Sequence, residues 1–225
     1  RTVGFTKNPF SFLFSKRIKH EINGTHEVQR NHSLVEWMVG PEVAKPKLYP
    51  SSQEIEKVKV YKVGSYITVS PASVWYTKQL KKERWIEFLA GLPHDLNVFL
   101  LGAASDFELC EVIKVEAPSA RIVNLAGKLS MLESAALMCE AKMNYVNDSA
   151  PMHLASAMNA PVTAVFCSTV PKFGFGPLSD KSFVVETTEQ LGCRPCGLHG
   201  YRACPKSHFK CALTIGKEQL MATLN

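Results

Sequence analysis

The chain has 225 residues, of which 46% are hydrophobic, 9% aromatic and 20% charged. This composition supplies enough apolar residues for a sizeable core, so it excludes an intrinsically disordered or collagen-like chain. No uncharged apolar run reaches the length of about 18 residues that a membrane-spanning helix needs. Lys and Arg exceed Asp and Glu to give a net charge of +6, a mild excess that favours anionic partners such as phosphates.

The first 60 residues contain few regular elements. Thr2–Phe5 predicts a strand and Thr25–Val39 predicts a helix, whereas residues 40–60 have the Pro-, Gly- and Ser-rich composition of a linker. The chain begins at Arg1, with neither an initiator Met nor a signal peptide. These observations suggest the end of one domain, followed by a complete second domain.

We therefore expect two parts. Residues 1–60 are interpreted as the remnant of an N-terminal domain with its linker, and residues 61–225 as a complete domain. From residue 66 onward, strand-like and helix-like stretches alternate, which predicts βαβ units and a parallel sheet with helices on both faces. The fold class is α/β, with a Rossmann-like parallel sheet. The predicted strands are Tyr66–Ser70, Asn97–Leu101, Arg121–Asn124, Met143–Asn147, Val162–Phe166 and Phe183–Val185.

Two helix starts carry the spacing of a capping box. Ser105 precedes Glu108 by three residues, and Ser130 precedes Glu133 by the same interval. In this motif the serine oxygen accepts a backbone amide of the first turn, while the glutamate reaches back to the amide of the cap residue. Both sites therefore predict the first turn of a helix.

The segment from Asn147 to His153 is the first candidate for chemistry. It follows a predicted strand and opens a helix that Asp148 or Ser149 can cap, with Pro151 tolerated in the first turn. A helix N-terminus at the carboxyl end of a parallel strand is a site for an anion. A capped helix with an incidental histidine is an equally good interpretation of the spacing alone.

Two loops after predicted strands are further candidates. Ser70–Lys78 carries Lys78, whose ammonium can meet a phosphate as a point charge, although a solvated surface lysine is the commoner case. Ser168–Pro177 contains hydroxyls and glycines that can present backbone amides to a ligand. It lacks the Gly-Lys-Ser/Thr of a Walker loop, and a plain turn is the alternative.

Seven cysteines and no secretory signal argue against a disulfide framework and favour a reducing cytoplasm. Four of them, Cys193, Cys196, Cys204 and Cys211, lie within one segment, here called the Cys-rich loop (residues 193–211). Four thiolates are sufficient for a tetrahedral structural zinc, but the second pair lacks Cys-x-x-Cys spacing. The alternative is a loop of reduced cysteines packed against the domain.

In this order the motifs closely resemble those of the ADP-heptose:lipopolysaccharide heptosyltransferases, glycosyltransferase family 9. The hallmark Asp-Thr/Ser-Gly-x-x-His of that family is matched by residues 148–153. The resemblance extends over nearly the whole chain. The other matching segments are Pro71-Ala72-Ser73 with Lys78, Leu101-Gly102, Asn124 to Ser130, Phe166 to Pro171 with Gly176-Pro177, and the Cys-x-Pro-Cys tail from Cys193.

The resemblance implies a GT-B architecture, in which two Rossmann-like domains face each other across a cleft. It implies a nucleotide-sugar donor, ADP-heptose, bound mainly by the C-terminal domain. The acceptor would be a lipid-linked core oligosaccharide of lipopolysaccharide. Transfer would invert the anomeric carbon without a cofactor or catalytic metal, in the cytoplasm and with peripheral contact with the inner membrane. No nucleic-acid partner is expected.

The resemblance also implies roles for individual residues. Lys78 would be the catalytic residue, pairing with the diphosphate and stabilising the charge on departing ADP. Asp148 would order its loop or bind heptose hydroxyls, and Asp106 would lie near the ribose. The remaining donor-binding residues would be Ser73, Ser149, Ala150, Pro151, His153 and Thr169.

The sequence departs from the family pattern at three places. Ala150 stands where the family has Gly, and Cys167 replaces the Gly of Phe-Gly-x-Thr. The Gly-Asp motif that supplies the family's general base has no counterpart, so we expect weak donor binding or none, and no transfer, by this chain alone. On the acceptor side, the aromatic and basic segment Phe10–Lys19 is interpreted as a packed aromatic cluster with solvated basic residues, rather than as a lipid-contacting surface.

Two alternatives to the heptosyltransferase interpretation stay open. The chain could belong to a family 9 transferase that uses another nucleotide sugar, or it could be a non-catalytic nucleotide-sugar-binding or zinc-stabilised module.

Overall fold

The computed structural model describes residues 2–117 and 121–224. The chain forms two compact units, one made of residues 1–46 with 171–176 and the other of residues 47–170 with 177–225. The boundary lies nearer the N-terminus than residue 60. Residues 47–60 belong to the larger unit because helix α3 (Ser52–Val58) packs on helix α6 (Met131–Cys139) through the Lys57–Glu133 ion pair at 2.8 Å.

The smaller unit contains a two-stranded parallel sheet, β1 (Val3–Phe5) and β2 (Lys16–Ile18). The predicted strand at residues 2–5 is therefore confirmed. The predicted single helix over 25–39 is wrong, because the segment forms two short helices, α1 (Glu27–His32) and α2 (Glu36–Val39). The helix stops at Ser33, whose hydroxyl donates to the Arg30 carbonyl at 2.6 Å and competes with the helical hydrogen-bond pattern.

The segment between these two strands does not form the packed aromatic cluster that the sequence suggested. Phe10, Phe12 and Leu13 are 63%, 69% and 66% exposed. They lie in or beside a single 3-10 turn, η1 (Ser11–Leu13), between strands of three residues. Elements this short offer too little apolar surface to cover three large side chains within the unit.

The larger unit is built on a six-stranded, all-parallel sheet of order β5-β4-β3-β6-β7-β8. This is the strand order of a Rossmann fold. The predicted Rossmann-like α/β fold is thus confirmed. The strands are β3 (Tyr66–Ser70), β4 (Asn97–Leu100), β5 (Arg121–Asn124), β6 (Asn144–Asn147), β7 (Val162–Phe166) and β8 (Ser182–Glu186).

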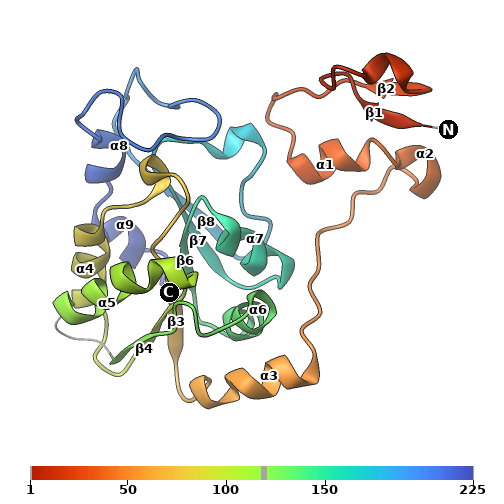
Figure 1. Ribbon diagram of the computed structural model, residues 1–225. Helices are drawn as coiled ribbons and strands as arrows, with labels where there is room; N and C mark the ends of the chain where they lie inside the picture. The colour runs from red at the N-terminus through yellow and green to blue at the C-terminus, as the bar shows by residue number, and fades with distance from the viewer. Residues whose placement is uncertain (1, 118–120, 225) are drawn as a thin grey trace. The chain divides into compact units, whose positions relative to one another are not determined.

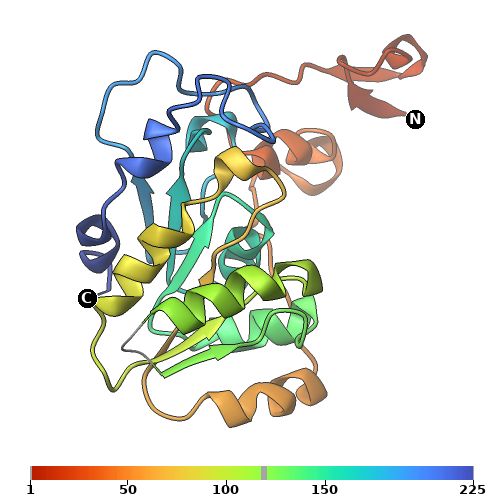
Figure 2. The same cartoon turned by 60° about the vertical axis from the view of Figure 1, so that its left-hand side comes forward.

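Helices cover both faces of this sheet (Figures 1 and 2). On one face lie α4 (Lys82–Ala90), α5 (Phe107–Glu116), α8 (Lys210–Leu213) and α9 (Lys217–Met221), and on the other lie α3, α6 and α7 (Ala150–Ala157). The first layer is anchored by the fully buried Trp85 and Phe88, as the helical spacing of the apolar residues predicts. Burial of large apolar side chains on both faces holds the sheet between the two layers.

Only one of the two predicted capping boxes forms. Ser130 accepts from the Glu133 amide at 3.2 Å, and the Glu133 carboxylate accepts from the Ser130 amide at 2.7 Å. At the other site α5 begins later than expected, because a 3-10 turn, η4 (Ala104–Asp106), precedes it. There the Asp106 carboxylate accepts the Ala103 amide at 2.8 Å, so the Ser105–Glu108 box is wrong.

The strand order reverses between β3 and β6, which are neighbours although they are far apart in the chain. From β3 the chain moves outward to β4 and β5, and from β6 it moves in the opposite direction. The loops after β3 and β6 therefore diverge and leave a crevice at the carboxyl ends of these strands. In residues 2–117 and 121–224, no helix combines the length and apolar character that crossing a membrane requires.

The capping boxes give a matched test of local stability. Replacing Ser130 with Ala removes a side-chain acceptor from the first turn of α6, and we expect the free energy of unfolding to fall by about 1 kcal/mol. Ser105→Ala removes no cap and should change it by less than about 0.5 kcal/mol. Urea unfolding of both variants measures the difference, and equal losses would contradict the assignment of the caps.

Candidate functional site

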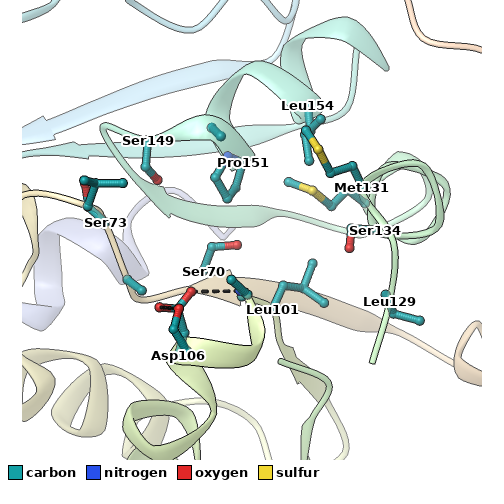
Figure 3. Close-up of a pocket in the computed structure, with 17 residues that line it drawn as sticks. Ser70, Ser73, Leu101, Asp106, Leu129, Met131, Ser134, Ser149, Pro151 and Leu154 are labelled. Atoms are coloured by element: carbon teal, nitrogen blue, oxygen red, sulfur yellow. Dashed lines mark hydrogen bonds between the residues drawn. The ribbon is translucent and has the colours of Figure 1, made fainter. Parts of the chain in front are cut away.

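A pocket of about 420 Å³ opens at the carboxyl ends of β3, β4 and β6, where the strand order reverses (Figure 3). This volume lies within the range of small-molecule and cofactor sites. The lining residues are Ser70, Ala72, Ser73, Val74, Leu101, Gly102, Ala103, Ser105, Asp106, Leu129, Met131, Ser134, Met138, Ser149, Ala150, Pro151 and Leu154.

The pocket has a polar side and an apolar side. Ser73 and Ser149 lie on one side, whereas Met131 and Leu154 lie on the other, with Ser134 beside them (Figure 3). An apolar slot that continues into a hydroxyl-lined pocket suits a ligand with a flat, weakly polar ring at one end and a polar or charged group at the other.

The polar side includes the start of α7. Ser149 occupies the N-cap position, but no side chain caps this helix, and the Ser149 hydroxyl instead donates to the Asn147 carbonyl at 3.3 Å. Pro151 lies in the first turn as predicted. An uncapped helix N-terminus offers amide donors and the positive end of the helix dipole, so this wall of the pocket can hold an anion.

Asp106 lies at the rim of the pocket, in the turn before α5. Besides the Ala103 amide, its carboxylate accepts the Ser105 hydroxyl at 3.3 Å. Gly102 makes this position available, because a Cβ there would come within 2.9 Å of the Asp106 side chain. The carboxylate is thus fixed where it can accept hydroxyl groups of a ligand.

Ser70, the last residue of β3, lines the pocket; the sequence placed it in a candidate loop but indicated no role for its own side chain. It is 1% exposed, and its hydroxyl has no hydrogen-bond partner among the described residues. A buried hydroxyl without a partner is costly, and such groups often mark a functional position. In the sequence Ser70 is one more small residue at a strand end, so no pattern distinguished it.

Lys78, Asp148 and Thr169 form a second group beside the pocket. The Lys78 ammonium lies 2.7 Å from Asp148 Oδ2, and the Thr169 hydroxyl donates to the same oxygen at 2.6 Å. The side chains of Lys78 and Asp148 are only 17% and 7% exposed. The Lys78 ammonium is therefore fixed in a largely buried ion pair and is not a solvated surface cation. The Thr169 hydroxyl is directed at Asp148, and Thr169 does not line the pocket.

Asn147 ties the loop that carries Lys78 to β6. Its side chain donates to the Pro71 carbonyl at 2.7 Å and accepts the Leu80 amide at 3.0 Å. Both bonds are buried, so they fix the loop at its beginning and at its end. The sequence analysis did not assign this role to Asn147.

The structure thus gathers some of the sequence-derived candidates and separates others. Ser73, Asp106, Ser149, Ala150 and Pro151 line one pocket. His153 is exposed on α7 and does not line that pocket.

The Cys-rich loop supports the Lys78 turn from outside the pocket. The Tyr201 amide donates to the Thr77 hydroxyl at 2.7 Å, and the Thr77 amide donates to the Tyr201 carbonyl at 3.1 Å. The Arg194 guanidinium donates to the carbonyls of Cys167 and Thr169 at 2.7 and 2.8 Å. The loop therefore fixes the segments on both sides of the Lys78–Asp148 pair.

The cysteines of this loop are free thiols in the structure. Among the residues that the structure describes, no three His, Cys, Asp or Glu side chains are arranged to hold a metal ion. The arrangement thus gives no support to the structural-zinc prediction for Cys193, Cys196, Cys204 and Cys211. Burial raises the pKa of the Cys211 thiol to about 11.

The sheet order, the pocket at its reversal point and the uncapped α7 N-terminus define an α/β protein of the Rossmann type with a candidate ligand site at the carboxyl ends of its strands. Comparison with protein families identifies it further. Residues 2–200 match glycosyltransferase family 9 (heptosyltransferase), and the chain belongs to this family.

Individual relatives agree with this assignment. Over 95 residues the chain is 36% identical to lipooligosaccharide heptosyltransferase 2 of Haemophilus influenzae, a match that spans 41% of this chain and 27% of that protein. Among solved structures it is similar to E. coli ADP-heptose LPS heptosyltransferase II, with a TM-score of 0.74 and 21% identity over 99% of this chain and 69% of that one.

Two other solved structures share the fold. A family 9 glycosyltransferase from Veillonella parvula gives a TM-score of 0.76 at 16% identity, covering 99% of this chain and 65% of that one. E. coli heptosyltransferase WaaC with ADP gives 0.61 at 18% identity, covering 96% of this chain and 61% of that one. The chain thus spans only part of the length of each of these relatives.

The unpaired hydroxyl of Ser70 has a measurable consequence. Ser70→Ala removes a buried polar group that gains no hydrogen bond, so the free energy of unfolding without ligand should rise by about 1 kcal/mol. Thr68 in the same strand is the control, because its hydroxyl donates to Asn144 at 2.6 Å and Thr68→Val should lower stability. Urea unfolding tests both, and a loss of stability in Ser70→Ala would show that the hydroxyl has a partner.

Thiol reactivity tests the state of the cysteines. Burial raises the pKa of Cys110 to about 12 and of Cys211 to about 11, and it also raises that of Cys167. Because the thiolate is the reactive form, we expect these three to resist Ellman's reagent at pH 8 until the protein is unfolded. The half-buried Cys193 and Cys204 should react in the folded protein, as peptide mapping can show. Joint protection of Cys193, Cys196 and Cys204, together with stoichiometric zinc, would contradict the free-thiol arrangement.

Proposed function

We propose that the chain is the donor-binding part of a heptosyltransferase that transfers heptose from ADP-heptose to the inner core of lipopolysaccharide, with inversion. The observation that carries the proposal is the pocket at the sheet reversal, which combines an apolar slot with an uncapped helix N-terminus. The family match, the Haemophilus influenzae relative and the E. coli structures support the choice of reaction.

The shape of the pocket suggests how the donor lies. The adenine occupies the apolar side near Met131 and Leu154, and the ribose hydroxyls meet the Asp106 carboxylate. The diphosphate lies at the start of α7, against the Ser149 hydroxyl and the adjacent amides. Ser73 and Pro151 complete the wall beside the phosphates and the sugar.

In the reaction, an acceptor hydroxyl oxygen attacks the anomeric carbon of the heptose. The bond from that carbon to the diphosphate oxygen breaks, and ADP leaves with the electron pair. Lys78 does not line the pocket, but it pairs with Asp148, the residue directly before the Ser149 N-cap, and from there its ammonium stabilises the negative charge that grows on the leaving group. The hydroxyl proton passes to a general base, and we assign no residue of these 225 to that role.

The proposal includes the wider setting of the site. The protein has the GT-B architecture, and residues 1–46 belong to the acceptor side. Its acceptor is a lipid-linked core oligosaccharide, met at the cytoplasmic face of the inner membrane through peripheral contact. The exposed Phe10 and Phe12, with Lys16 and Arg17 in the following strand, suit an anionic, partly apolar surface of this kind.

A second candidate is a family 9 transferase with a different nucleotide sugar. Ala150 supports it, because a methyl group lines the pocket at the position where the family motif that residues 148–153 resemble has Gly, and it narrows the space beside the phosphates and the sugar. Calorimetric titration of ADP-heptose, ADP-glucose and GDP-mannose distinguishes the two. Preference for ADP-heptose is expected, and equal or better binding of another donor would replace the first candidate with the second.

Lys78 gives the sharpest single-residue test. Lys78→Ala removes the cation next to the phosphate wall, and loss of a charged hydrogen bond should weaken ADP binding by about 10- to 100-fold. Lys114→Ala is the matched control, because Lys114 pairs with Glu111 at 2.7 Å on another helix and should leave ADP affinity unchanged. Isothermal titration calorimetry on folded variants measures both, and unchanged affinity in Lys78→Ala would discard the role of Lys78.

A further inference from the structure

Thr169 and Lys78 share one acceptor atom. Thr169 follows β7 and is 1% exposed. Its hydroxyl and the Lys78 ammonium both reach Asp148 Oδ2, at 2.6 and 2.7 Å. An O–H···O distance of this length is typical of a charge-assisted hydrogen bond to a carboxylate. The position of the carboxylate therefore sets the position of the ammonium.

We propose that Thr169 is a positioning residue for donor binding, which holds the Asp148 carboxylate in place so that the Lys78 ammonium can turn from it to the diphosphate. The inference rests on the proposed function, in which Lys78 meets the diphosphate. Thr169 itself is directed at Asp148 and does not line the pocket.

A lysine needs such support more than most side chains. Its four-carbon stem carries about 2 kcal/mol of rotamer entropy, and an ammonium has no preferred hydrogen-bond direction. A carboxylate held only by that ammonium could turn with it. The hydroxyl of Thr169 comes from a different strand end than Asp148, so it supplies a fixed second donor.

Ser168, the residue before Thr169, contacts the backbone that leads into Lys78. The Ser168 hydroxyl donates to the Thr77 hydroxyl at 3.1 Å, and the Ser168 amide donates to the Thr77 carbonyl at 3.3 Å. Thr77 directly precedes Lys78 in the 3-10 turn η3 (Tyr76–Lys78). Ser168 thus contacts the backbone next to Lys78, and Thr169 contacts the carboxylate that pairs with the Lys78 ammonium.

The backbone of Thr169 is in turn held by Arg194 of the Cys-rich loop. Arg194 donates to its carbonyl at 2.8 Å and also to the carbonyls of Cys167 and Phe166 at 2.7 and 3.2 Å. Arg194 thus joins three backbone carbonyls at and just after the end of β7, which supports the position of Thr169.

This arrangement has a consequence when an anion binds. In the free protein, Asp148 neutralises Lys78. A diphosphate attracts the ammonium and repels the carboxylate, and the Thr169 hydroxyl compensates Asp148 as the ammonium turns. Without that hydroxyl, the Asp148 carboxylate competes more strongly with the diphosphate for the Lys78 ammonium, so ADP binds more weakly.

Four proteins test this with ADP as the ligand in isothermal titration calorimetry. Thr169→Val keeps the shape and loses the donor, and it should raise the Kd for ADP about fivefold or more. Thr169→Ser keeps the hydroxyl and should stay within about twofold of the unaltered chain. Thr163→Val, in the strand that precedes Thr169, should also stay within about twofold, because Thr163 donates to Thr223 at 2.8 Å and does not contact Asp148.

A double-mutant cycle separates positioning from general damage. In a Lys78→Met background, Thr169→Val should change ADP affinity by less than about twofold, because the group that it positions is gone. An equal effect in both backgrounds would overturn the proposal, as would wild-type affinity in Thr169→Val. Failure of the unaltered chain to bind ADP would overturn the proposed function as well. Thermal unfolding checks each variant, and Thr169→Ala replaces Thr169→Val if the latter does not fold.

Discussion

The parallel pairing of β3 with β6 is the constraint on which the site depends. These strands are side by side in register, Thr68 opposite Asn144 and Ser70 opposite Val146. Their carboxyl ends bring together two loops that are remote in sequence, one with Lys78 and the other with Asp148. The buried hydrogen bond from Thr68 to Asn144 at 2.6 Å reinforces the pairing. Because the strand order reverses here, the crevice arises from the topology of the sheet, and the side chains determine only which chemical groups line it.

Most of the larger fold could be predicted from the sequence, and the exceptions have physical causes. Strands such as Tyr66–Ser70 were predicted with their observed bounds, because buried parallel strands are short apolar runs between turn residues. Ser130 caps a helix and Ser105 does not, although both have a glutamate three residues later. The difference comes from Asp106, which takes the amide at the start of the turn, and such competition is invisible in the spacing.

The candidate site was predictable in outline but not in its internal contacts. The helix start at residues 149–151 and the neighbouring Ser73 followed from motif and strand position, and the pocket contains them. The orientation of Thr169 toward Asp148 could not be predicted from the sequence, because it depends on how the ends of β6 and β7 lie in the folded sheet. Asn147 and Ser70 lay in candidate segments, but no pattern indicated a role for either side chain, since a single buried polar residue at a strand end has many structural explanations.

The position of the Cys-rich loop in the chain also affects the order in which parts of the site form. Its hydrogen bond from Tyr201 to Thr77 joins residues 124 positions apart. Contacts of such long sequence separation form late, because the loop-closure entropy must be overcome before they contribute. The sheet and its helices up to α7 can therefore assemble first, while the turn that carries Lys78 acquires its final support only when the Cys-rich loop arrives. During synthesis, the pocket could form before the turn that carries Lys78 acquires this support.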